Sequence, residues 1–271
     1  MTAKDFQVFE NGQPKPIAEV ESSSAPFKLV LLLDVSGSVE ELLDFIRKAA
    51  RSFVTTASSQ DRLAVISFRD DVQLVSDFTT NRRQLLEAVD QIDAGGSTAL
   101  YDSLAYVLLH TLRPLRGART AVVVLSDGDD NKSFLPFPSL LDVAVESGAV
   151  IYPLYVPSGL IRRGEAALLS PHRAAADVDP MRNKLLTLTT RAESEGRRLA
   201  EESGGVFYPI KRLGDLQQAY QDIMGQLRTS YGVTYLSDYQ DARERRVRVR
   251  VDRTDAAVKL SPAVEAVSIK Q

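Results

Sequence analysis

Three short runs of oxygen-bearing side chains could do chemistry together. They are the segments Asp34-Val-Ser36-Gly-Ser38, Gly96-Ser97-Thr98 and Ser126-Asp127-Gly128. Their carboxylates and hydroxyls are hard oxygen ligands, which suit Mg²⁺, Mn²⁺ or Ca²⁺ and not softer metals. Two carboxylates at most neutralise a divalent ion, and hydroxyls add no charge, so an ion held here stays electrophilic. Such a site favours an anionic oxygen that comes from outside the chain.

The apolar pattern predicts that these runs meet. Short apolar runs recur along the centre of the chain, at residues 27–33, 63–68, 121–125 and 150–156. Segments with apolar residues at helical spacing lie between and after them. This alternation predicts an α/β fold: a doubly wound, mostly parallel sheet flanked by helices on both faces. Asp34 follows the first run and Asp127 follows the third, and ligands bind at the carboxyl ends of strands in such sheets.

The remaining elements follow from the same patterns. Helical spacing predicts helices over residues 42–53, 85–92, 100–112, 140–145, 185–199 and 213–227. Residues 72–75 are predicted to form an edge strand, and residues 206–210 a short last strand. Gly204-Gly205 predicts a glycine cap at the C-terminus of the helix before it.

The flanks predict a small accessory β unit. Asn11-Gly12, between weakly alternating residues over 5–20, is a hairpin signal. Residues 21–26 are typical of a linker. Alternation with period two returns within residues 231–268, which predicts antiparallel strands that pair with the N-terminal hairpin.

These patterns divide the chain into three parts. We expect a hairpin and linker over residues 1–25, a central domain over residues 26–229 and C-terminal strands over residues 230–271. Residues 157–183 contain Pro and Gly with little periodicity. They are predicted to be a loop inserted in the central domain, with one short helix near residues 165–169.

Composition excludes several kinds of site. The chain has 271 residues, no Cys, two His and a formal net charge of −3. Disulfides, zinc–thiolate sites, iron–sulfur clusters and thiol nucleophiles are therefore excluded. A small negative net charge does not indicate a protein that binds nucleic acid. No apolar run approaches the ~18 residues of a membrane span, and the first residues have neither the basic nor the apolar region of a signal peptide.

Each oxygen-bearing run also has a simpler interpretation. Ser38, Ser97 or Thr98 could cap a helix N-terminus, and Asp127-Gly128 is a common turn. The occurrence of all three runs together favours a shared site, because they fall in order at consistent ends of the predicted strands.

Together the three runs resemble the metal-ion-dependent adhesion site of von Willebrand factor type A (VWA) domains, and residues 26–229 are similar to that fold. The resemblance implies that Ser36, Ser38 and Thr98 are direct or near-direct metal ligands. It implies that Asp34 and Asp127 bind the metal directly or through water. The implied cofactor is Mg²⁺, with Mn²⁺ or Ca²⁺ as alternatives, and the implied partner is a protein whose Glu or Asp completes the metal shell.

The flanks resemble a narrower group. The segments Asp5-Phe-Gln-Val-Phe-Glu-Asn-Gly, Gly204-Gly205-Val-Phe-Tyr and Tyr231-Gly-Val-Thr-Tyr are similar to stretches of bacterial VWA-related proteins, many described from Acidobacteria. Such proteins are usually exported, which implies a secreted or cell-envelope location. The absence of a signal peptide in this chain leaves a cytoplasmic location open.

Three functions remain open at this point. The first is a non-enzymatic, metal-dependent protein-binding or adhesion module with no catalytic residues. The second is an intracellular assembly factor that works beside an ATPase. The third is a metal-dependent hydrolase, for which the sequence offers no evident general base or phosphate clamp. It has neither the Gly-x-Ser-x-Gly elbow of α/β-hydrolases nor a P-loop.

Overall fold

A six-stranded sheet forms the centre of the molecule. The computed structural model describes residues 1–23, 26–115, 118–156, 180–211, 213–228, 230–237 and 247–252. The central sheet has the order β6-β5-β4-β7-β8-β9. Its strands are β4 (Lys28–Asp34), β5 (Arg62–Phe68), β6 (Val72–Thr79), β7 (Thr120–Ser126), β8 (Val150–Tyr155) and β9 (Tyr208–Pro209). All neighbours pair in parallel except β5 and β6, which are antiparallel. The mostly parallel sheet is confirmed, with β6 as an edge strand.

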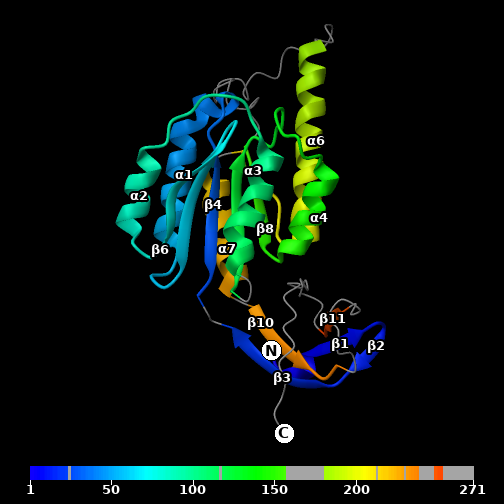
Figure 1. Ribbon diagram of the computed structural model, residues 1–271. Helices are drawn as coiled ribbons and strands as arrows, with labels where there is room; N and C mark the ends of the chain where they lie inside the picture. The colour runs from blue at the N-terminus through cyan, green and yellow to red at the C-terminus, as the bar shows by residue number, and fades with distance from the viewer. Residues whose placement is uncertain are drawn as a thin grey trace.

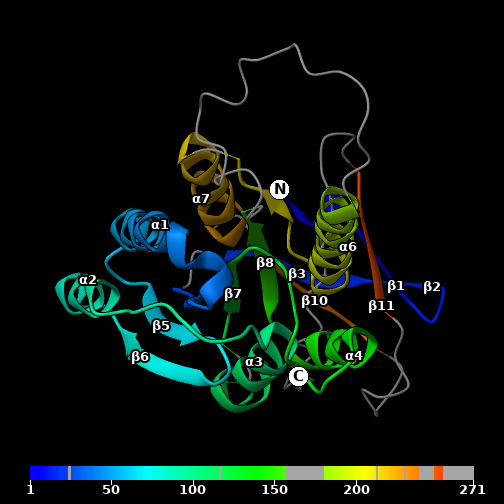
Figure 2. The same cartoon turned by 90° about the horizontal axis from the view of Figure 1, so that it is seen from above.

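Helices cover both faces of this sheet (Figures 1 and 2). On one face lie α1 (Leu43–Thr56), α2 (Arg82–Asp90) and α7 (Leu213–Arg228). On the other face lie α3 (Leu100–Tyr106), α4 (Phe137–Ser147) and α6 (Pro180–Ser203). Shorter helical turns are η1 (Ala3–Asp5), η2 (Gly37–Leu42), η3 (Val107–Leu112) and η4 (Arg113–Leu115).

Strand β4 shows why the sheet needs two helical layers. Leu29, Leu31 and Leu33 lie in the core cluster that contains α1, α2 and α7. Val30 and Leu32 lie in the cluster that contains α3, α4 and α6. Because successive side chains of a strand point to opposite faces, a continuous apolar run is stable only when both faces are covered. The doubly wound architecture is therefore confirmed.

Helix α6 differs from its predicted bounds at its N-terminal end. It begins at Pro180, so residues 180–183 of the predicted 157–183 loop are helical. Proline suits the first turn of a helix because its missing N–H would have no helical partner there. The rest of the predicted loop, with the short helix expected near residues 165–169, lies outside the described residues.

The C-terminal end of α6 has the glycine cap that the sequence predicts. Gly204 adopts a φ of +82°, and the Gly205 N–H donates to the Ala200 carbonyl at 2.7 Å. The strand that follows is shorter than predicted, because β9 covers only two of the residues 206–210.

The two flanks form the accessory β unit that was predicted. The hairpin strand β1 (Phe6–Glu10) pairs with β2 (Gln13–Lys15) and with β11 (Val247–Val251), whereas β3 (Ile17–Ser23) pairs with β10 (Ser230–Tyr235). All three pairings join strands in antiparallel directions, and two of them join the N-terminal segment to the C-terminal segment. The structure thus confirms that the flanks pair with each other.

Two details of this unit differ from the prediction. The turn residues Asn11 and Gly12 have φ values of 49° and 83°, as a two-residue type I′ hairpin requires. However, the second arm of the hairpin is only the short β2, because β3 crosses to β10 instead. Strand β3 also runs through Ser23, so residues 21–23 of the linker predicted over residues 21–26 are strand. The boundaries at residues 25 and 229 stay predictions.

The accessory unit lies at the end of the central sheet where β4 begins (Figure 1). It has a buried polar anchor. Glu10 is fully buried, and its Oε1 accepts hydrogen bonds from the Tyr235 hydroxyl at 3.0 Å and the Ser237 hydroxyl at 2.7 Å. This contact joins β1 to the end of β10. The carboxyl ends of the parallel strands, where the predicted site lies, are at the opposite end of the sheet.

Within the described ranges, none of the helices combines the length and the apolar character needed to cross a bilayer.

Candidate metal centre

Asp34 is the buried centre of the site. It ends β4 and is fully buried. Its Oδ1 accepts hydrogen bonds from the Ser36 backbone N–H at 2.9 Å and from the Ser36 hydroxyl at 2.6 Å. Its Oδ2 accepts from the Ser126 hydroxyl at 2.6 Å. Because β4 and β7 are parallel neighbours, Ser126 reaches Asp34 directly across the sheet edge. These donors hold the carboxylate in one orientation.

Ser126 belongs to the third sequence run but not to the predicted site residues, and its contacts make it a positioning residue. Besides donating to Asp34, its Oγ accepts the Gly128 N–H at 2.9 Å. One hydroxyl therefore fixes both the first carboxylate and the turn that follows the second. The signal for it was its place at a strand end, directly before Asp127.

A chain of hydroxyl contacts joins the two carboxylates. The Ser36 and Ser38 Oγ atoms lie 2.9 Å apart, and the Ser38 hydroxyl faces the Asp127 carboxylate, where it partly offsets the rise in the pKa of that group. Asp34, Ser36 and Asp127 are buried, whereas Ser38 is exposed. Ser38 therefore lies on the side of the site that is open to solvent.

The segment that carries Thr98 is held between the other two loops. On one side, the Gly95 N–H donates to the Val35 carbonyl at 2.8 Å, and the Gly37 N–H donates to the Gly96 carbonyl at 2.9 Å. On the other side, the Thr98 carbonyl accepts the N–H groups of Asn131 and Lys132, both at 3.0 Å. All three sequence runs thus meet at the carboxyl edge of the sheet.

The helix-cap interpretation of these hydroxyls is wrong. The N-cap of α1 is Leu42 and the N-cap of α3 is Ala99, and neither makes a side-chain cap bond. Ser38 lies inside η2, and Ser36 precedes η2 without capping it. The hydroxyls of Ser36, Ser38 and Thr98 are therefore not used to satisfy helix N-termini.

Two buried oxygen atoms at this site have no hydrogen-bond partner: Thr98 Oγ1 and Asp127 Oδ2. Buried polar atoms nearly always have a partner, so two such atoms on neighbouring loops need an explanation. A hard cation would supply it. Among the described residues, no group of three or more Asp, Glu, His or Cys side chains could hold a metal ion, so a ligand set here would have to combine the two carboxylates with the three hydroxyls. This donor set fits Mg²⁺, which uses few protein carboxylates.

The electrostatics of the site also favour a cation. Burial raises the pKa of Asp34. Burial, with the nearby Asp34 charge as a second cause, raises the pKa of Asp127 to about 6. The pKa of Asp129 also rises to about 6 through burial and the charge of Asp127. Ionised carboxylates are thus disfavoured here, and a divalent ion would relieve that penalty because its charge stabilises their ionised form.

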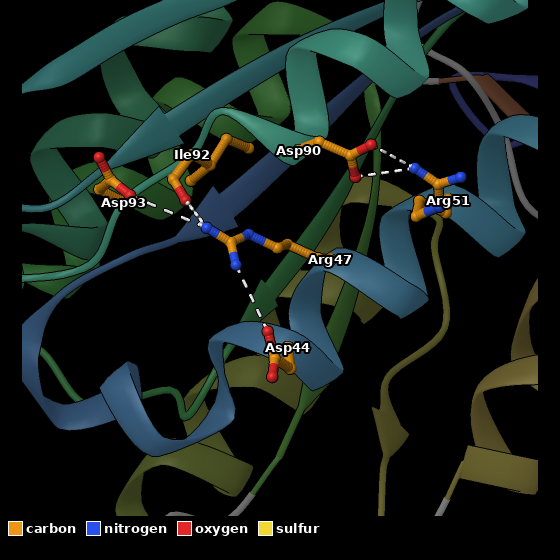
Figure 3. A network of polar contacts seen from close by, with 6 residues as sticks. All are labelled: Asp44, Arg47, Arg51, Asp90, Ile92 and Asp93. Atoms are coloured by element: carbon orange, nitrogen blue, oxygen red, sulfur yellow. Dashed lines mark hydrogen bonds and ion pairs between the residues drawn. The ribbon is translucent and has the colours of Figure 1, made fainter.

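An ion-pair network fixes the frame around the site (Figure 3). Arg47 on α1 donates to the Ile92 carbonyl at 2.6 Å and lies 3.8 Å from Asp93. Arg51, one turn further along α1, contacts both carboxylate oxygens of Asp90 at 2.7 and 2.6 Å. Helix α1 follows the Ser38 turn, and the segment after α2 leads to Thr98. The network therefore ties two of the ligand-bearing segments together.

Comparison with known proteins identifies this architecture. Residues 29–129 match the sequence profile of the von Willebrand factor type A domain. This chain contains a VWA domain. The matched range includes all five predicted site residues, Asp34, Ser36, Ser38, Thr98 and Asp127. No curated protein sequence matches the chain. The predicted similarity to proteins from Acidobacteria stays a prediction.

Solved structures share the fold at low identity. BatB from Bacteroides thetaiotaomicron has a TM-score of 0.55 and 14% identity, over 75% of this chain and 100% of its own. A von Willebrand factor type A protein from Catenulispora acidiphila has a TM-score of 0.54 and 16% identity, over 83% of this chain and 50% of its own. The pilus adhesin SpaC from Lactobacillus rhamnosus GG has a TM-score of 0.53 and 12% identity, over 83% of this chain and 34% of its own.

VWA domains are typically non-enzymatic interaction modules, so the match over residues 29–129 suggests a protein-interaction module.

Proposed function

We propose that this VWA domain binds a partner protein through a divalent metal ion, Mg²⁺ in the first place. Asp34, Ser36, Ser38, Thr98 and Asp127 would hold the ion. One observation carries the proposal: Thr98 Oγ1 and Asp127 Oδ2 are buried without hydrogen-bond partners. They belong to two different loops that meet beside the hydroxyl chain of Ser36 and Ser38.

Each of these residues has a proposed role. Ser36 donates its hydroxyl proton to Asp34 and accepts from Ser38, so one lone pair of its Oγ is left for a cation. Asp34 and Asp127 provide the negative charge, whereas the three hydroxyls provide neutral oxygen. When bound, the ion supplies a Lewis acid that attracts an anionic oxygen. Ser126 keeps Asp34 oriented and does not itself need to reach the ion.

The partner is proposed to be a protein that presents a Glu or Asp. Its carboxylate would approach from the side of the exposed Ser38. The accessory β unit lies at the opposite end of the sheet (Figure 1), so it does not obstruct this approach. A secreted or cell-surface location is part of the proposal, and the similarity of the fold to a pilus adhesin supports it.

A small carboxylate probe tests this function without knowledge of the partner. In ¹H–¹⁵N correlation spectra, Mg²⁺ should shift the amide resonances of residues 34–38, 96–99 and 126–129. N-acetyl-glutamate amide, added next, should shift the same resonances only when Mg²⁺ is present. N-acetyl-glutamine amide is the neutral control and should leave them unchanged, because it offers no anionic oxygen.

One outcome of this titration would contradict the proposal. If the glutamate probe gives the same shifts in EDTA as in Mg²⁺, its binding does not depend on the metal and the proposal is wrong. The Thr98→Val variant separates the two steps, since it removes one proposed ligand and should weaken the responses to both Mg²⁺ and the probe.

A further inference from the structure

Phe134 is a large apolar side chain that the fold displays to solvent beside the candidate metal centre. It is 95% exposed, and among the described residues no other large hydrophobic side chain exceeds the 58% of Leu74. Single exposed apolar residues are common on protein surfaces and by themselves indicate nothing. The way in which the chain holds Phe134 is what distinguishes it.

The backbone around Phe134 is fixed by hydrogen bonds to α3. The Asp102 carboxylate accepts the Phe134 N–H at its Oδ2 and the Leu135 N–H at its Oδ1, both at 2.9 Å. The Asp102 N–H donates to the Ser133 hydroxyl at 3.0 Å, and that hydroxyl donates to Asp130 at 2.8 Å. These bonds engage the residues on both sides of Phe134, so the loop conformation is fixed while the ring points outward.

The neighbours of Phe134 point inward and leave only the ring exposed. Leu135 packs against the core cluster that contains α3 and α4, and Ser133 is half-buried. Full exposure of a Phe ring forgoes the stabilisation that its burial would provide. An aromatic side chain held in this way is suited to contact another molecule, since aromatic residues are enriched in the central contacts of protein interfaces.

Phe134 lies close to the proposed metal ligands. The loop that begins at Asp127 passes Thr98, where the Thr98 N–H donates to Asn131 Oδ1 at 3.1 Å. It then reaches Asp102 in the first turn of α3, four residues after Thr98 and therefore at most about 14 Å from it. An extended peptide advances about 3.3–3.6 Å per residue. A peptide with its carboxylate at the metal therefore reaches the ring within roughly two to four residues.

We propose that Phe134 is a second contact of the same interface and packs against a large apolar residue of the partner. That residue would lie roughly two to four positions from the partner's Glu or Asp. The preferred ligand is therefore an acidic segment with an apolar neighbour, not an isolated carboxylate. This inference rests on the proposed function.

A library of random linear peptides displayed on phage tests the inference. Peptides are selected in Mg²⁺ on the wild-type protein and on the Phe134→Ser and Leu74→Ser variants, and are released with EDTA. Wild type and Leu74→Ser should enrich peptides with a Glu or Asp and a large apolar residue at that spacing. Phe134→Ser should keep the acidic preference and lose at least about tenfold of the apolar enrichment, equivalent to 1.4 kcal/mol.

The outcomes separate this inference from the proposed function. If Phe134→Ser selects the same acidic and apolar peptides as wild type, Phe134 is not a contact, although the metal site stands. If EDTA releases no acidic peptides from wild type, the proposed function fails and this inference fails with it. The thermal response of Phe134→Ser to Mg²⁺ should equal that of wild type, because the exposed ring touches none of the proposed ligands.

Discussion

The Asp34→Ala variant should lose the thermal stabilisation that divalent metal gives the wild-type protein. At a metal concentration 100 times its dissociation constant, wild type should gain about 2.7 kcal/mol. This gain corresponds to a rise in Tm of roughly 5–10 °C for a chain of this size. Asp34 should be decisive because it carries one of two negative charges at the site and orients the Ser36 hydroxyl.

The measurement is thermal unfolding in EDTA and in millimolar Mg²⁺, Mn²⁺ or Ca²⁺. Each protein is compared with itself, so any change in basal stability caused by the loss of Asp34 cancels. The matched control is Asp142→Ala, which removes the same charge from an exposed position of α4. The control should keep the full response to metal. An equal rise in Tm for Asp34→Ala and Asp142→Ala would show that the metal binds elsewhere.

Replacing Gly205 with alanine should strongly destabilise the fold, although it adds only one methyl group. A Cβ at this position would overlap the Ile151 carbonyl oxygen and lie 2.7 Å from its carbonyl carbon. Ile151 is near the start of β8, where the backbone is held between β7 and the end of α6. Because backbone atoms cannot move aside as a side chain does, we expect a loss of about 3 kcal/mol or more.

The control for this prediction is Gly225→Ala. Gly225 is exposed in α7, and a Cβ there would meet no atom within 4 Å. Alanine is the better helix former, so this change should stabilise the protein by about 0.8–1 kcal/mol. Urea unfolding of both variants gives the comparison. Similar stabilities for the two variants would contradict the close packing of Gly205 against β8.

Sequence periodicity was sufficient to predict the central architecture. The run from Leu29 to Leu33 is apolar at every position, and this pattern is stable only in a sheet that is covered on both faces. The order of elements then places Asp34 and Asp127 at one sheet edge. Thr98 reaches the same edge in the segment between α2 and α3, and its place directly before a predicted helix was the signal for it.

Other features depend on long-range contacts that local patterns do not encode. The pairing of β3 with β10 could not be predicted from residues 17–23, because the sequence of a strand does not specify which other strand it pairs with. The role of Ser126 follows from its contact with Asp34 across the sheet. The display of Phe134 depends on hydrogen bonds to Asp102, which lies 32 residues earlier in the sequence.

The most direct test of the metal site is the stability of Thr98→Val with and without Mg²⁺. Valine has nearly the shape of threonine but lacks the hydroxyl, and Thr98 Oγ1 has no hydrogen-bond partner. In EDTA, Thr98→Val should be as stable as wild type or up to about 1 kcal/mol more stable, since an unsatisfied buried polar atom is removed. In saturating Mg²⁺ the order should reverse, with wild type the more stable protein. If Thr98→Val gains as much from Mg²⁺ as wild type does, Thr98 is not a ligand and the proposed metal centre is wrong.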